Sequence, residues 1–198
     1  MMRKMNKIVD GYDPVFVADM LDLLGVKGVG AWGTKLQAVA EELDETFGPF
    51  EGQLVISFAA MFNGCRVCSV GHMYVANLHH FEETGELFVI DEREVYELQV
   101  LSDEELLAVA ADRMAAPQYE RARKLIARLH ALKYGGEAIV NPEDELLAGA
   151  IAAWDLLTEC SILSDIEDPA QIDPLTSIAK RKDLIERYQA ARGRKPKG

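Results

Sequence analysis

The positions of the prolines constrain the fold of this chain more than any other feature of its sequence. Six of the seven prolines fall at the boundaries of segments with helical apolar spacing, and Pro196 lies in the tail. At three boundaries a capping residue precedes proline at the first helical position: Asp13-Pro14, Asn141-Pro142 and Asp173-Pro174. Residues 87–90 form the only short run with β-like composition. The sequence therefore predicts an all-α fold, a multi-helix bundle.

The first half of the chain is expected to be a series of helices. Apolar residues at helical spacing predict helices that end at Gly25, run from Thr34 to Phe47, cover residues 50–62, and begin at or near Cys65. Residues 26–33 carry three glycines and are predicted to form a loop. The acidic run over residues 41–45 is expected to be a solvated helix face. In the second half, Trp154 is expected to be a core residue.

The length of the chain bears on its domain organisation. A chain of 198 residues is long enough for one well-filled hydrophobic core. We expect a single all-α domain over residues 1–190, with two loosely related helical halves, 1–85 and 86–190, as the alternative division. The basic residues near the end predict a tail over residues 191–198.

Net charge and hydropathy indicate which classes of binding partner are not expected. The net charge of −12 argues against general nucleic-acid binding, which needs a basic face. No uninterrupted apolar run reaches the roughly 18–20 residues that a membrane span needs. No apolar stretch follows the charged start, so a secretory signal is not expected. We therefore expect a cytoplasmic protein with no nucleic-acid and no membrane partner.

Residues 63–72 concentrate the reactive side chains of the chain. Cys65, Cys68 and His72 have the spacing C-x-x-C-x-x-x-H and include two of the three cysteines and one of the four histidines. In a reducing cytosol, a close cysteine pair is redox-active or binds a metal more often than it is structural. At the start of a helix, unpaired N–H groups and the helix dipole favour a thiolate over a thiol. His72 lies one turn beyond Cys68 on the same helix face.

This arrangement suits the reaction of thiols with a hydroperoxide. A thiolate attacks the O–O bond to give a sulfenic acid, which a second thiol condenses to a disulfide. The cycle needs a lowered thiol pKa, a resolving thiol and a proton donor for the leaving alkoxide, and residues 65–72 offer all three. Gly71, between Cys68 and His72, leaves room either for a substrate or for close helix packing.

Together with the segment before them, these residues resemble the signature of a known family. The run Gln53-Leu54-Val55-Ile56, followed by Asn63-Gly64-Cys65-x-x-Cys68-x-x-x-His72, is similar to the alkylhydroperoxidase D-like, carboxymuconolactone decarboxylase superfamily. The resemblance is specific over about residues 50–85. It implies a helical bundle with the Cys-x-x-Cys pair at the start of a central helix, and a homo-oligomer, either a trimer or a hexamer.

The resemblance also implies an activity and a role for each residue. The chain would be an antioxidant peroxidase or disulfide reductase, in which Cys68 attacks a small hydroperoxide, Cys65 resolves the intermediate and His72 transfers protons. No tightly bound cofactor is implied. An external dithiol such as dihydrolipoamide, or a thiol reductant protein with a lipoyl group, would reduce the disulfide. The helix dipole alone favours Cys65 as the more acidic thiol, so which cysteine attacks stays open.

Gln53 stands where the family carries an acidic residue, twelve positions before the first cysteine. A glutamine can orient an imidazole or a water, but it does not exchange a proton at neutral pH. His79 shares the helix face of His72 and is a candidate to support it from outside the site. A zinc site on the cysteine pair is disfavoured because His79 lies about 16 Å along the helix from Cys68, at 1.5 Å per residue. We expect no metal.

Two other functions stay open. The first is a non-catalytic redox sensor or assembly protein that keeps the cysteines without turnover, and Gln53 in place of the acid favours it. The second is a lyase that resembles carboxymuconolactone decarboxylase. The decarboxylating members of the superfamily do not rely on a cysteine pair, which disfavours this alternative.

Overall fold

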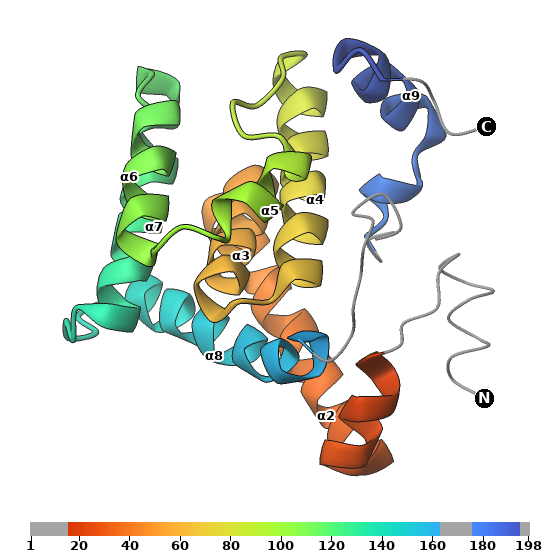
Figure 1. The fold of residues 1–198 in the computed structure, drawn as a ribbon, viewed down its shortest axis with the longest axis vertical. Coiled ribbons are helices and arrows are strands. Elements are labelled where there is room, and N and C mark those ends of the chain that lie inside the picture. The colour runs from red at the N-terminus through yellow and green to blue at the C-terminus, as the bar shows by residue number, and fades with distance from the viewer. Residues whose placement is uncertain (1–15, 163–175, 195–198) are drawn as a thin grey trace.

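The computed structural model describes residues 16–162 and 176–194, which fold into helices joined by short turns (Figure 1). The α-helices are α2 (Phe16–Phe47), α3 (Pro49–Asn63), α4 (Arg66–Thr84), α5 (Val95–Leu98), α6 (Asp103–Arg113), α7 (Glu120–Tyr134), α8 (Pro142–Ile162) and α9 (Lys182–Ala191). The short 3-10 helices are η1 (Glu92–Glu94), η2 (Pro117–Tyr119) and η4 (Ile178–Lys180). No strand occurs among the described residues, and the predicted all-α fold is confirmed.

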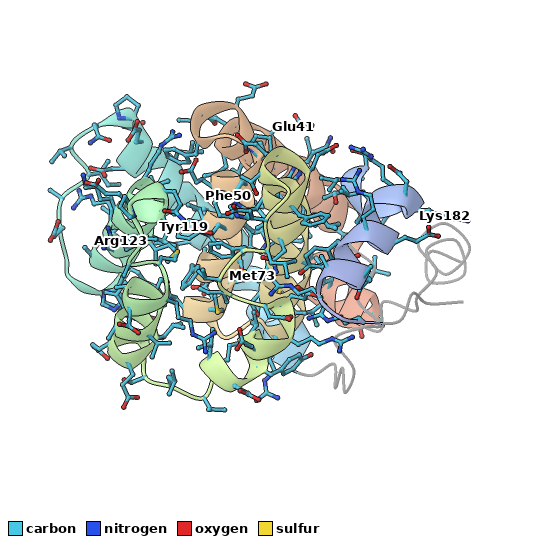
Figure 2. All side chains as sticks on the ribbon, turned by 90° about the horizontal axis from the view of Figure 1, so that it is seen from above. Glu41, Phe50, Met73, Tyr119, Arg123 and Lys182 are labelled. Carbon is cyan, nitrogen blue, oxygen red and sulfur yellow. A yellow bond between two sulfur atoms is a disulfide. The ribbon has the colours of Figure 1, made fainter. Side chains whose placement is uncertain are left out.

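The central helix of the bundle is α3. Its residues 52–62 are all buried, because α3 packs against α2, α4, α7 and α8. In Figure 1, α6 and α7 lie on one side of the α3–α4 pair, α9 lies on the other, and α8 crosses the end at which α4 begins. Met73 of α4 lies in the interior, whereas Glu41 of α2 and Lys182 of α9 lie at the periphery (Figure 2).

Glycine and proline define both ends of α3. Gly48 precedes Pro49 with a φ of 88°, and Gly64 ends the helix in the left-handed conformation with a φ of 84°. The helix predicted over residues 50–62 is therefore confirmed. The next helix, α4, starts at Arg66 with Cys65 as its N-cap.

The loop predicted over residues 26–33 is wrong. The backbone does break at Gly25, which has a φ of 67°, but residues 26–33 are helical and belong to α2. Val29 and Trp32 pack against the core, and the Trp32 indole N–H donates to the Ala153 carbonyl of α8 at 3.2 Å. Burial of this apolar face outweighs the low helix propensity of the three glycines.

The last helix, α9, is fixed to the body by a buried carboxylate. Glu92 accepts hydrogen bonds from the Tyr188 hydroxyl at 2.6 Å and the Asn77 amide at 2.8 Å, and it pairs with Arg194. Arg192 donates to the Tyr188 hydroxyl at 3.1 Å. Two arginines of the predicted basic tail are therefore held against the folded body.

One hydrophobic cluster takes in residues from Met20 of α2 to Trp154 of α8, and thus includes both of the halves considered from the sequence. The helix starts predicted at Asp13-Pro14 and Asp173-Pro174 fall outside the described residues. None of the helices in the described part of the chain combines the length and the apolar character required to cross a membrane.

Candidate redox site

The two cysteines lie at the start of α4, beside the turn that follows α3. Cys65 caps the helix, Cys68 lies in its first turn, and the two form a disulfide across a Cα–Cα distance of 5.5 Å. The backbone N–H of Cys68 donates to the Cys65 sulfur at 3.4 Å. Because Cys65 is fully buried and Cys68 is partly exposed, a reagent from solvent reaches Cys68 first.

The end of α3, directly before Cys65, is held in place by α7 and α8. The Asn63 side-chain amide donates to the Ile151 carbonyl of α8 at 2.9 Å. The Lys133 ammonium of α7 donates to the Phe62 carbonyl and, at 2.6 Å, to Asn63 Oδ1. The Tyr134 hydroxyl donates to the same Phe62 carbonyl at 2.8 Å. These bonds satisfy groups at the end of α3, where a cation also complements the helix dipole.

Both ring nitrogens of His72 have hydrogen-bond partners. The Trp154 indole N–H donates to His72 Nε2 at 3.2 Å, and His72 Nδ1 lies 2.9 Å from Gln53 Oε1. An indole only donates, so Nε2 is the acceptor and Nδ1 carries the proton. Burial lowers the pKa of His72 to about 4, which keeps the imidazole neutral at physiological pH. The site therefore holds a neutral histidine in one tautomer.

Asp44, near the end of α2, holds the other side of the Gln53 amide. Gln53 Nε2 lies 3.1 Å from both Asp44 Oδ1 and Asp44 Oδ2. A carboxylate only accepts, so the amide N–H group faces Asp44 and the amide oxygen faces His72. Burial raises the pKa of Asp44 to about 6, and the Gln53 hydrogen bond opposes that rise. The Asp44 carboxylate is thus connected to His72 by two successive hydrogen bonds through the Gln53 side-chain amide.

Gly52 allows α2 and α3 to approach closely enough for this contact. A Cβ at position 52 would lie 2.5 Å from Asp44 Oδ1, 2.9 Å from the Asp44 backbone nitrogen and 2.9 Å from the Leu43 carbonyl carbon. Any side chain there would force the two helices apart. The glycine therefore sets the distance between Asp44 and Gln53.

Gly71 and His79, the other two candidates from the sequence, also lie on α4. Gly71 is buried in the turn between Cys68 and His72. His79 is partly buried, which lowers its pKa, and the charges that act on it are those of Glu82, Arg181 and Glu83. These charges belong to the end of α4 and the segment before α9.

Sequence reasoning missed two residues of the site. Asp44 belongs to the acidic run expected on a solvated face, but it is partly buried and bonded to Gln53. Leu43, the residue before it, belongs to the apolar stripe of the same helix. This neighbour was the available signal that Asp44 lies at the edge of the buried face. The predicted core position of Trp154 is confirmed, since this residue is 1% exposed. A buried indole N–H needs an acceptor, which was the available signal for its bond to His72.

In the described part of the chain, no group of three or more His, Cys, Asp or Glu side chains is arranged to hold a metal ion. The described polar contacts of the site form two groups: the Cys65–Cys68 pair, and the series that joins Asp44, Gln53, His72 and Trp154. The chain matches no protein-family model, no curated protein and no solved structure with which it was compared.

Proposed function

We propose that the chain is a thiol-dependent redox enzyme of the alkyl hydroperoxide reductase or disulfide reductase type. The observation that carries the proposal is the Cys65–Cys68 disulfide at the start of α4, on the helix that also carries His72 one turn further on. A partly exposed cysteine beside a buried one suits a cycle in which one cysteine meets the substrate and the other resolves. Membership of the alkylhydroperoxidase D-like superfamily, which the motif predicts, stays a prediction.

In the proposed reaction the Cys68 thiolate forms a bond to the terminal oxygen of a small organic hydroperoxide, ROOH. The O–O bond breaks, and the alkoxide takes a proton and leaves as the alcohol ROH. The Cys65 thiolate then attacks the sulfur of the Cys68 sulfenic acid, and hydroxide leaves with a proton as water. Two thiols are oxidised to one disulfide, and the hydroperoxide is reduced by two electrons.

His72 is the proposed proton carrier. Its Nε2 holds a lone pair, and His72 lies one turn after Cys68 on the same helix face. A neutral imidazole can take the proton of the Cys68 thiol and return it to the alkoxide. In the disulfide form the Trp154 N–H occupies this nitrogen, so proton transfer requires Nε2 to exchange that hydrogen bond for one with the thiol.

The return to the dithiol needs an external dithiol, such as dihydrolipoamide or the lipoyl group of a thiol reductant protein. Its thiolate would attack the more exposed Cys68 sulfur, and Cys65 would leave as a thiolate. The Cys68 N–H, which already donates to the Cys65 sulfur at 3.4 Å, would stabilise that thiolate. Assembly as a trimer or hexamer belongs to the same proposal and is measured by light scattering.

A count of free thiols tests the proposal. The reduced protein is treated with one equivalent of cumene hydroperoxide, and we expect it to lose two thiols. Cys68→Ser should abolish the loss of the thiol pair, whereas Cys160→Ala, which removes the cysteine outside the motif, should leave it intact. Excess dihydrolipoamide should then support repeated turnover. Unchanged thiols in the wild-type protein would exclude the proposed reaction.

A non-catalytic redox sensor is the second candidate, and the engagement of both His72 nitrogens favours it. A histidine whose basic nitrogen is already bonded is a slow proton carrier. The two functions differ in the thiol assay. A sensor would lose two thiols once. Dihydrolipoamide would then reduce its disulfide too slowly to support repeated turnover.

A further inference from the structure

On the basis of the thiol redox function proposed above, we propose that Asp44 is a positioning residue for His72. Its carboxylate fixes the orientation of the Gln53 amide, and that amide favours the imidazole tautomer in which Nε2 carries the lone pair and can act as the base once it releases the Trp154 N–H. The acid acts from α2, through one glutamine of α3, on a histidine of α4.

The hydrogen bonds form a continuous series in which every donor points toward Asp44: Trp154 donates to His72, His72 donates to Gln53, and Gln53 donates to Asp44. The Asp44 carboxylate accepts from Gln53 Nε2 with both oxygens at 3.1 Å. The Gln53 Oε1 then accepts from His72 Nδ1 at 2.9 Å, and His72 Nε2 accepts from the Trp154 N–H at 3.2 Å. Each of these donors meets an acceptor, so the pattern has no mismatched pair.

The reversed amide shows what Asp44 contributes. If Gln53 turned over, its oxygen would face the Asp44 carboxylate, and two acceptors would oppose each other. Its N–H group would face His72 Nδ1, which would have to lose its proton. The proton would move to Nε2, where it would meet the Trp154 N–H and leave no lone pair for the thiol. The carboxylate at position 44 and the Trp154 N–H therefore favour the same tautomer, in which Nε2 is the basic nitrogen.

The packing around the Asp44–Gln53 contact shows that this contact is part of the folded core and not an incidental surface contact. Gln53 is 3% exposed, so little solvent competes for its amide. The approach of Asp44 depends on the missing side chain at Gly52, since a Cβ there would lie 2.5 Å from Asp44 Oδ1. When His72 becomes an imidazolium, the Asp44 charge also acts on it through the polarised Gln53 amide.

The chain offers a swap that tests this inference. In the double variant Asp44→Asn with Gln53→Glu, the amide and the carboxylate exchange places. The amide introduced at position 44 donates to the carboxylate introduced at position 53, and that carboxylate accepts from His72 Nδ1, so the donor and acceptor pattern at His72 is preserved. Gln53→Glu alone places two carboxylates face to face, so the pair holds a proton between them. Asp44→Ala removes the partner of the Gln53 N–H group.

Two readouts separate positioning from stability. The first is the tautomer of His72, read from the ¹⁵N chemical shifts of its imidazole in the full-length protein. The second is the single-turnover rate of disulfide formation with cumene hydroperoxide. In Asp44→Ala we expect loss of the pure Nδ1–H tautomer and a rate lower by about 10- to 100-fold. Gln53→Glu alone should also be slow, and the double variant should recover the wild-type tautomer and most of the rate.

Glu45→Ala is the matched control, because Glu45 is the exposed neighbour of Asp44 on the same helix, and it should behave as wild type. If Asp44→Ala does not fold, Asp44→Leu, which is closer in size and offers no acceptor to the Gln53 N–H group, and the double variant carry the test. An unchanged tautomer in Asp44→Ala or Asp44→Leu, or a double variant no faster than Gln53→Glu, would overturn the inference. If wild type does not react with hydroperoxide, the redox function fails, while the tautomer still reports on Asp44.

Discussion

The indole N–H of Trp154 donates to His72 Nε2 at 3.2 Å, with the two rings edge to face at a centroid distance of 5.4 Å. This bond stabilises the neutral imidazole, because a protonated Nε2 would oppose the indole donor. Trp154 thereby adds to the effect of burial, which lowers the pKa of His72 to about 4. In the disulfide form, the lone pair of His72 Nε2 is therefore bonded to the tryptophan of α8.

Replacement of Trp154 by phenylalanine should release this nitrogen. We expect the pKa of His72 to rise modestly above about 4, because burial, the cause of its low value, persists, and we expect the reduced protein to react a few-fold faster with hydroperoxide at neutral pH. NMR titration of His72 and stopped-flow thiol oxidation measure the two effects. Trp32→Phe is the control, since Trp32 also donates one indole hydrogen bond to α8, at 3.2 Å to Ala153. Each variant should cost about 1 kcal/mol of stability, and equal effects of both on His72 would contradict the prediction.

The cysteine that attacks the hydroperoxide should be identified by trapping its sulfenic acid with dimedone. Cys68 is partly exposed and Cys65 is fully buried, so Cys65→Ser should yield the adduct on Cys68. Cys68→Ser should yield little or none on Cys65. Peptide mass spectrometry locates the adduct. A dimedone adduct mainly on Cys65 would reverse the proposed roles and favour the assignment from the helix dipole.

Stability should depend on pH through Asp44. Burial raises its pKa from 3.8 to about 6, so the stability it contributes is fully present below pH 3.8 and is lost as the pH rises through about 6. Asp44→Asn cannot ionise. Relative to that variant, wild type should lose on the order of 1 to 2 kcal/mol of unfolding free energy between pH 4 and pH 7.5, a value reduced for partial exposure.

Urea unfolding at the two pH values measures this loss. Glu45→Gln, at the exposed neighbouring position, should differ from wild type by the same amount at both pH values. A wild-type protein that gains stability over Asp44→Asn as the pH rises would show that the buried carboxylate is stabilised by a charge partner instead.

Gly52→Ala should weaken the contact between α2 and α3. The added Cβ would lie 2.5 Å from Asp44 Oδ1 and 2.9 Å from backbone atoms of Leu43 and Asp44, so the helices must separate. We expect a loss of about 1 to 3 kcal/mol and a slower thiol reaction, measured by urea unfolding and stopped-flow. Gly149→Ala in α8 is the matched control, because its added Cβ would have no atom within 4 Å apart from the adjacent backbone of its own helix. That variant should be neutral or more stable, by up to about 1 kcal/mol.

Features encoded over a few residues could be predicted from the sequence, and long-range contacts could not. The limits of α3 follow from Gly48-Pro49 and Gly64, which act within one turn. Residues 26–33 were mispredicted because their helix depends on contacts with α8, such as that of Trp32 with Ala153, 121 residues away.

The candidate site likewise has a part that could be predicted from local sequence and a part that depends on long-range contacts. The spacing of Cys65, Cys68 and His72 is local and is visible in the sequence. The bond from Trp154 joins residues 82 positions apart, and the bond from Gln53 to Asp44 crosses the turn at Gly48-Pro49. Neither follows from periodicity, because periodicity shows which face is buried and not what that face meets.

The burial of α3 on every side has a consequence for motion. Backbone amides in such a helix exchange with solvent deuterium only when the whole bundle opens, whereas the ends of helices exchange by local fraying. We therefore expect Gln53 to lie in a slowly exchanging segment of the described chain, whereas Cys68, which is partly exposed, lies at a helix start. Hydrogen exchange should be slow in α3 around Gln53 and faster at the start of α4, so that under the proposed function a substrate would reach the cysteines by movement at the start of α4 and not of α3.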